Sequence, residues 1–245
     1  MSEIIGERNE KGFFEEIDKL VKKIRTLDEI VVVHHYDADG LTSGAIAIKA
    51  LKREGKTVKH LCLKQVYKEN LDEIKALGKN FLFVDFGSGQ IDYLLELGEE
   101  NLFILDHHQP VKINDEIPKL KYHINPLLFG IDGGKEISGA GVSFFFALAL
   151  NQKNKDLVTL ALIGAVGDMQ DFSGKLIGLN RKLLDIGIET NLIEVKNDLR
   201  LYGRISRPLL SYLMFVSNCL YYLLKFSLHQ YKFQDFQNSY HEVLD

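Results

Sequence analysis

The sequence has little cysteine. Two cysteines, Cys62 and Cys219, occur in 245 residues, far apart and outside any C-x-x-C pair. A disulfide framework and a zinc site of the cysteine type both need more thiols at closer spacing. Both are therefore excluded, and this cysteine usage is typical of a protein in a reducing cytoplasm.

The sequence also lacks an excess of positive charge and an uninterrupted membrane segment. Its formal net charge is −4, so nucleic-acid binding would have to come from a local patch or from bound metal. The N-terminal stretch MSEIIGERNEKGFF contains acids and no apolar core, which argues against a secretory signal. Asn218, Lys225 and several serines interrupt the apolar stretch 209–228, so we expect no membrane span.

What the sequence does contain is a regular alternation of helical and strand patterns. Strands are predicted at 29–35, 56–63, 80–87, 101–108 and 119–126, and helices within 1–27 and at 41–55, 69–78 and 91–98. Three further helices are predicted at 139–150, 156–167 and 177–187. Because the connections are too long for hairpins, this order predicts an α/β fold: a mostly parallel sheet flanked by helices, followed by helices.

Acids and histidines gather where the predicted strands end. The first strand runs into VVVHHYDADG, which contains His35, Asp37 and Asp39. The remaining members are Asp85 in FLFVD, Asp106, His107 and His108 in LFILDHH, and Asp168 and Asp171 in GAVGDMQD. We expect them to meet, because the carboxyl ends of parallel strands share one edge of the sheet. Taken alone, VVVHHYDADG is equally typical of a strand that ends in a polar turn.

The types of ligand indicate the type of ion. Carboxylates and imidazoles without thiolates suit hard to borderline divalent ions, Mn²⁺ first and Mg²⁺ or Co²⁺ next. Asp37 and Asp39 lie two residues apart and can bind different ions, while a central carboxylate such as Asp85 can bridge both. With Asp168 these carboxylates carry four negative charges, which two divalent ions would neutralise before an anionic substrate arrives. Two such metal ions can activate a water molecule for in-line attack on phosphorus.

Four motifs, HHYDADG, VDFG, DHH and GDMQD, occur in this order along the chain. They resemble motifs I to IV of the DHH phosphoesterase superfamily, especially its RecJ-like single-strand-specific exonuclease branch of archaeal type. The resemblance covers residues 28–210. It implies a two-domain phosphodiesterase with manganese at the domain interface, and a nuclease of the kind used in DNA repair.

The resemblance also implies a role for each motif residue. One of two Mn²⁺ ions would be bound by His35 and Asp37, and the other by Asp39, His107 and Asp168. Asp85 would bridge them. The catalytic residues would be Asp85, His107 and His108, with His108 against the substrate phosphate. Asp106 would orient the imidazoles without binding an ion.

Two other segments are candidates for substrate contact. Ser138 and Gly139 precede an apolar helix, whose first N–H groups could receive an anion, although the pattern favours Ser138 as a plain N-cap. Arg204 and Arg207 in LYGRISRP could contact a nucleic-acid backbone or lie in a solvated loop.

The last part of the sequence departs from the family pattern. Family members usually continue with a smaller domain that carries a Gly-rich, His-containing motif, and no such motif follows Pro208. We therefore expect an N-terminal helix in 1–27, a DHH phosphoesterase domain in 28–208 and an atypical tail in 209–245. The tail is interpreted as a truncated or frame-shifted product or as a divergent C-terminal helix.

Three classes of function are compatible with these motifs. The first is a metal-dependent phosphodiesterase acting on single-stranded DNA or RNA. The second is a relative with a smaller substrate, such as an oligoribonuclease, a nucleotide phosphatase or another small-phosphoester hydrolase. The third is a non-catalytic replication scaffold that binds GINS-type partners. Six convergent ligands argue against the third class, because a scaffold has no need to keep them.

Overall fold

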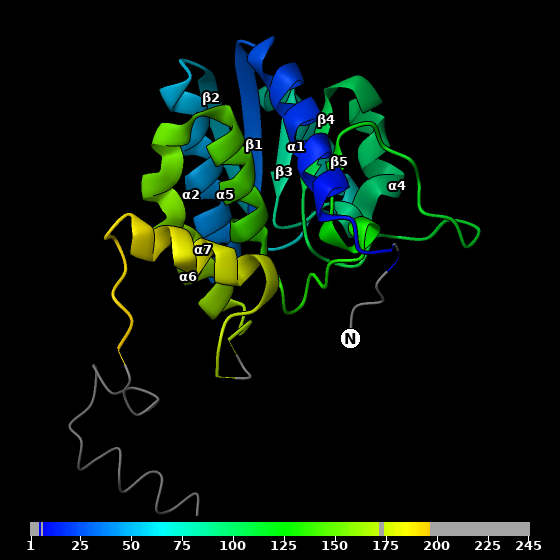
Figure 1. Cartoon of the computed structure of the whole chain (residues 1–245). Helices are drawn as coiled ribbons and strands as arrows, with labels where there is room; N and C mark the ends of the chain where they lie inside the picture. Colours follow the sequence, from blue (N-terminus) through cyan, green and yellow to red (C-terminus); the bar gives the residue numbers. More distant parts are fainter. Residues whose placement is uncertain (1–4, 6, 172–173, 197–245) are drawn as a thin grey trace, which may run out of the picture. The chain divides into compact units, whose positions relative to one another are not determined.

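A five-stranded sheet, parallel throughout, forms the centre of the protein. The computed structural model describes residues 5, 7–171 and 174–196, and Met1–Val195 form one compact unit. The strand order is β2-β1-β3-β4-β5 (Figure 1). The strands are β1 (Glu29–His35), β2 (Thr57–Leu63), β3 (Phe81–Val84), β4 (Leu102–Leu105) and β5 (His123–Ile124).

Helices cover both faces of this sheet. The α-helices are α1 (Glu10–Arg25), α2 (Ala38–Arg53), α3 (Leu71–Leu77), α4 (Ile91–Leu94), α5 (Gly139–Leu150), α6 (Val158–Gly167) and α7 (Gly178–Glu189). α1, α2 and α5 pack on one face, where α6 and α7 join the same apolar cluster, and α3 and α4 pack on the other face. The predicted α/β fold, including the three successive helices after the sheet, is confirmed.

Short 3₁₀ turns complete the connections. They are η1 (Lys68–Asn70), η2 (Ser88–Gln90), η3 (Leu95–Leu97), η4 (Glu99–Asn101), η5 (Pro126–Phe129) and η6 (Gln152–Leu157). The helix predicted at 91–98 therefore forms as α4 followed by η3. The strand predicted at 119–126 contains only the two residues of β5.

The strands are apolar on both faces because both faces are covered. In β1, Ile30 and Val32 belong to the cluster under α1, α2 and α5, while Val31 and Val33 belong to the cluster under α3 and α4. All four are completely buried. This explains why VVV is a continuous apolar run and not the alternating pattern of a sheet with one wet face.

The strand order decides where a site can form. From β1 the chain goes to β2 on one side and then to β3 on the other, so the order reverses between β1 and β3. Loops leave the carboxyl ends of these two strands in opposite directions and open a crevice between them. β1 and β3 are also the strands whose ends carry His35 and Asp85.

Some predictions fall on residues that the structure does not describe. The predicted tail 209–245, the boundary at 208 and the apolar stretch 209–228 all lie outside the described residues. Within residues 5, 7–171 and 174–196, no helix is long and apolar enough to cross a membrane.

A buried polar network ties β5 to the turn that follows β3. The Ser88 Oγ lies 2.8 Å from the His123 Nε2 and accepts a hydrogen bond from the Asn125 Nδ2 at 2.9 Å. Asn125 Nδ2 also donates to the His108 carbonyl at 2.8 Å. Because burial lowers the pKa of His123 to about 4, its ring is neutral at neutral pH and accepts the Ser88 proton.

This pKa predicts a pH-dependent loss of stability. The pKa of His123 is lower in the folded chain than the usual 6.5, so its contribution is complete above pH 6.5 and is lost as pH falls towards 4. The loss should amount to about 3 kcal/mol. We expect the free energy of unfolding in urea to depend less on pH in His123→Gln than in the wild type over this range. The control is His60→Gln, at an exposed position of β2. If the unfolding free energy of His123→Gln depended on pH as in the wild type, the lowered pKa of His123 would be contradicted.

Candidate metal centre

The turn after β1 places two of the candidate carboxylates. The strand ends at His35 and α2 begins at Ala38, with Asp37 as the N-cap, whose Oδ1 accepts a hydrogen bond from the Gly40 N–H at 2.9 Å. A Cβ at Gly40 would lie 2.4 Å from the His35 Cβ, so only glycine fits this close turn. VVVHHYDADG is therefore a strand, a capped turn and the first turn of a helix. It sets Asp37 and Asp39 on either side of the helix start.

Asp85 follows β3 in an unusual backbone conformation. Its φ is +65°, in the left-handed region that residues other than glycine seldom adopt. Its side chain is 1% exposed, and neither carboxylate oxygen has a hydrogen-bond partner among the described residues. A Cβ at Gly139 would lie 2.3 Å from Asp85 Oδ1, so the start of α5 also needs glycine to pass this carboxylate. Such strain and such unsatisfied oxygens are typical of a functional site.

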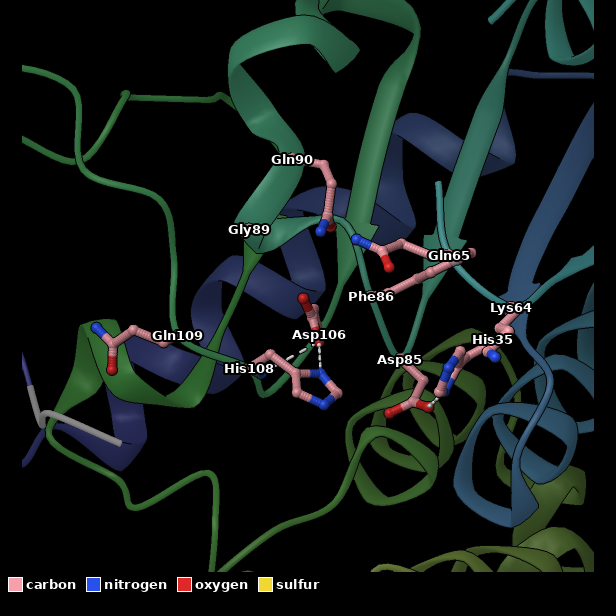
Figure 2. A pocket seen from close by; sticks show the side chains of 10 residues that line it. All are labelled: His35, Lys64, Gln65, Asp85, Phe86, Gly89, Gln90, Asp106, His108 and Gln109. Atoms are coloured by element: carbon pink, nitrogen blue, oxygen red, sulfur yellow. Dashed lines mark hydrogen bonds and ion pairs between the residues drawn. The ribbon is translucent and has the colours of Figure 1, made fainter. Parts of the chain in front are cut away.

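Asp106 holds the two histidines that follow β4. Its Oδ1 accepts hydrogen bonds from the N–H groups of His107 at 2.7 Å and His108 at 3.1 Å. The same oxygen lies 2.8 Å from the His108 Nδ1 (Figure 2). Its Oδ2 accepts the Ser88 N–H at 2.9 Å. Burial alone would raise the pKa of Asp106, but His108 and these donors hold that pKa well below its usual range. Asp106 is thus an anion that holds the backbone of His107 and both the backbone and the ring of His108.

Asp39 is held by the N-terminus of α5. The Gly139 N–H donates to Asp39 Oδ2 at 2.7 Å and the Ala140 N–H donates to Oδ1 at 2.9 Å. Burial, followed by the nearby charge of Asp85, nevertheless raises the pKa of Asp39 to about 7. Ser138 is the buried N-cap of this helix, with its Oγ accepting the Gly141 N–H at 3.3 Å. The anion at this helix start is therefore the protein's own carboxylate, and these contacts give no support to substrate binding by Ser138 and Gly139.

The remaining distances define two groups of ligands that meet at Asp85. On one side, the His35 Nδ1 lies 2.9 Å from Asp37 Oδ2 and 3.5 Å from Asp85 Oδ2. On the other side, the His107 Nε2 lies 3.2 Å from Asp85 Oδ1 and 3.5 Å from Asp39 Oδ2. The structure therefore brings these sequence-predicted ligands together, with one oxygen of Asp85 facing each group.

Asp168 completes the second group. It is the residue that follows α6, and its Oδ2 lies 3.9 Å from the His107 Nδ1. Ligand atoms of Asp39, His107 and Asp168 lie within 4.8 Å of one another, as do those of His35, Asp37 and Asp85 and those of Asp85, His107 and His108. Asp171 belongs to none of these three groups of described residues. Arg204 and Arg207 lie outside the described residues.

The unpaired atoms of this cluster fit divalent cations. The His35 Nδ1, both oxygens of Asp85 and the His107 Nε2 are buried and make no hydrogen bond in the described part of the chain. The His107 Nδ1 lies 2.6 Å from the Gly133 carbonyl, which directs the other ring nitrogen towards the carboxylates. Buried carboxylate and imidazole atoms without hydrogen bonds are costly unless a cation binds them. The donor set, oxygen and nitrogen without sulfur, suits Mn²⁺ or Mg²⁺.

Without bound metal, protonated imidazoles supply part of the positive charge that the buried carboxylates need. Burial would lower the pKa of His107, but the nearby carboxylates of Asp85 and Asp39 raise that pKa well above its usual value. The Asp85 carboxylate, whose Oδ2 lies 3.5 Å from the His35 Nδ1, raises the pKa of His35. Burial would raise the pKa of Asp85, but these two imidazoles lower it. The cluster therefore attracts positive charge from both sides of Asp85.

A cavity of about 410 Å³ lies beside the cluster (Figure 2). The residues lining it are His35, Lys64, Gln65, Asp85, Phe86, Gly89, Gln90, Asp106, His108 and Gln109. The amide oxygens of Gln65 and Gln90 accept hydrogen bonds from the Tyr67 hydroxyl and the Gly87 N–H. Lys64 and the glutamines were not among the residues predicted from the sequence. Their one signal was a position just after the predicted strands, which many surface residues share.

Comparison with known proteins identifies the family. The model of the DHH family, N-terminal domain, matches residues 29–165. An uncharacterized protein of Methanocaldococcus jannaschii is 36% identical over 194 residues, which is 75% of this chain and 44% of that protein. The single-stranded-DNA-specific exonuclease RecJ of Bacillus subtilis is 27% identical over 209 residues, which is 79% of this chain and 26% of that protein. The chain thus spans less than half the length of these curated relatives.

Solved structures agree with this assignment. A structure of exonuclease RecJ bound to manganese is 29% identical, with a TM-score of 0.58 over 73% of this chain and 47% of that chain. RecJ of Thermus thermophilus in complex with Mn²⁺ is 31% identical, with a TM-score of 0.56 over 73% of this chain and 27% of that chain. Together with the family match over residues 29–165, these likenesses show that the chain belongs to the DHH family and carries its N-terminal domain.

Proposed function

We propose that the protein is a metal-dependent phosphodiesterase that hydrolyses phosphodiester bonds of single-stranded nucleic acid. The observation that carries this proposal is Asp85, a buried carboxylate whose two oxygens make no hydrogen bond among the described residues and each face a separate group of ligands. Two ions held on either side of one carboxylate are typical of enzymes that cleave phosphate esters. The RecJ exonucleases that the chain resembles, including those solved with manganese, support the same reaction class and the same ion.

The proposed roles follow from the positions of the ligands. His35 and Asp37 would hold one Mn²⁺ ion, Asp39, His107 and Asp168 the other, and Asp85 would contact both. Mg²⁺ is the alternative that the same oxygen-rich donor set can bind. When bound, such ions polarise the phosphate and lower the pKa of a coordinated water, which supplies the nucleophile.

The protein's own groups would position the reactants. The helix start at Gly139 and Ala140 holds Asp39, and the Gly133 carbonyl holds His107. His108 is anchored through its Nδ1 to Asp106, and its half-exposed ring borders the cavity next to Asp85 (Figure 2). The charge of Asp106, which faces this ring, raises the pKa of His108. His108 is therefore suited to donate a hydrogen bond to a phosphate oxygen as negative charge develops there.

The cavity favours a substrate with a phosphate and further polar groups. Its lining combines Lys64 with the side-chain amides of Gln65 and Gln90, and it opens directly beside His108 and Asp85. Its volume of about 410 Å³ also lies in the range of small-molecule sites, so a small phosphoester is the second candidate substrate. A scaffold with a GINS-type partner is less favoured, because burying unpaired ligand atoms would only destabilise it.

Substitution of Asp85 and of His108 should have different effects. Asp85→Ala should lose Mn²⁺ binding and hydrolysis together, because both ion positions depend on this carboxylate. His108→Ala should keep Mn²⁺ binding and lower kcat by about 10²–10³, the usual cost of one hydrogen bond to developing charge. Mn²⁺ binding is measured by calorimetric titration. Hydrolysis is measured on 5′- and 3′-labelled single strands and, for comparison, on small phosphate esters.

The outcomes of this experiment separate the alternatives. His60→Ala, on the exposed side of β2, should match the wild type in both assays. Turnover of small esters with intact single strands would favour the second candidate substrate. An Asp85→Ala variant with the wild-type number of bound ions and the wild-type rate would show that Asp85 does not bridge them.

Removal of metal should lower thermal stability. Mn²⁺ at a hundredfold excess over its dissociation constant stabilises a folded protein by about 2.7 kcal/mol. For a chain of this size we expect the midpoint of thermal unfolding to fall by about 5–10 °C when a chelator replaces Mn²⁺. Asp85→Ala should abolish this shift. An equal shift in the variant would mean that Mn²⁺ binds elsewhere on the protein.

A further inference from the structure

Gln170 is buried beside the second group of ligands and contacts three oxygens. Its Nε2 lies 2.8 Å from Asp168 Oδ2, 2.8 Å from the Gly133 carbonyl and 3.3 Å from the Ile137 carbonyl. The residue is 5% exposed. A carboxylate and two backbone carbonyls can only accept hydrogen bonds, so the side chain must present its NH₂ to them.

The orientation of this amide is set by Asn180 on α7. The Asn180 Nδ2 donates to Gln170 Oε1 at 2.5 Å, and Asn180 is completely buried. The backbone N–H of Asn180 donates to the Glu136 carbonyl at 2.7 Å, which fixes the residue against the segment before α5. Gln170 therefore has an acceptor end that faces α7 and a donor end that faces the candidate ligands.

Through its donor end, Gln170 connects two ligands of the same ion position. It holds Asp168 directly, and it shares the Gly133 carbonyl with His107, whose Nδ1 lies 2.6 Å from that oxygen. The Gly133 carbonyl is the group that directs the other nitrogen of His107 towards Asp39 and Asp85. Substitution of groups that orient metal ligands through hydrogen bonds typically weakens metal binding by about 10–100-fold.

From these contacts we infer that Gln170 and Asn180 form a positioning pair that sets Asp168 and His107 for one of the two ions. This inference rests on the proposed function, since it assigns the pair to the ion position of Asp39, His107 and Asp168. The position formed by His35, Asp37 and Asp85 makes no contact with the pair among the hydrogen bonds and ion pairs of the described residues.

The test is Mn²⁺ titration of Gln170→Glu by calorimetry. This substitution keeps the shape of the side chain but places an oxygen against three acceptors. We expect one of the two ions to bind about 10–100-fold more weakly, the usual effect of such substitutions, while the other binds within about threefold of the wild type. Gln152→Glu is the matched control, because Gln152 is exposed and follows the opposite end of α5. It should leave both affinities unchanged.

A second variant covers the case that Gln170→Glu does not fold. Gln170→Met keeps the volume and removes the donor, so it should weaken the same single ion by about tenfold, with unfolding of the metal-free protein measured in parallel. Equal affinities in wild type and variants, or equal weakening of both ions in folded variants, would overturn the inference. A wild-type protein that binds no Mn²⁺ would instead overturn the proposed function and this inference with it.

Discussion

The candidate metal centre depends on the burial of two carboxylates, Asp39 and Asp85, close to the same imidazole, that of His107. His107 Nε2 lies 3.2 Å from Asp85 Oδ1 and 3.5 Å from Asp39 Oδ2. Two buried anions so close together repel each other, and burial together with the charge of Asp85 raises the pKa of Asp39 to about 7. The fold tolerates this arrangement because backbone N–H groups hold Asp39 and imidazoles flank Asp85. The two oxygens of Asp85 make no hydrogen bond among the described residues, and a divalent cation would stabilise their negative charge.

The rest of the fold serves to bring these groups together. The reversal of strand order between β1 and β3 opens the crevice, and the continuous apolar strands keep the sheet fixed beneath it. The start of α5 passes so close to the Asp85 side chain that glycine is needed at position 139. Ligands on four different segments are thus held by a rigid scaffold, as a metal centre requires.

Much of this could be predicted from the sequence because it follows from local rules. Apolar runs that end in acids place His35, Asp85 and His107 at one edge of a parallel sheet, and the structure brings them together there. The N-cap at Ser138 was the favoured interpretation of the helix start, but the sequence did not show that Asp39, 100 residues earlier, would accept its N–H groups. The roles of Gln170 and Asn180 could not be predicted from the sequence either. Their hydrogen bonds join segments whose relative placement depends on how α6 and α7 pack.

The central claim is that Asp85 lies between two bound ions. A crystal structure of the protein grown with Mn²⁺, with anomalous diffraction measured at the manganese absorption edge, tests it most directly. We expect two anomalous peaks about 3.5–4 Å apart, one on each side of the Asp85 carboxylate. A single peak, or peaks that leave both oxygens of Asp85 without a cation, would contradict it.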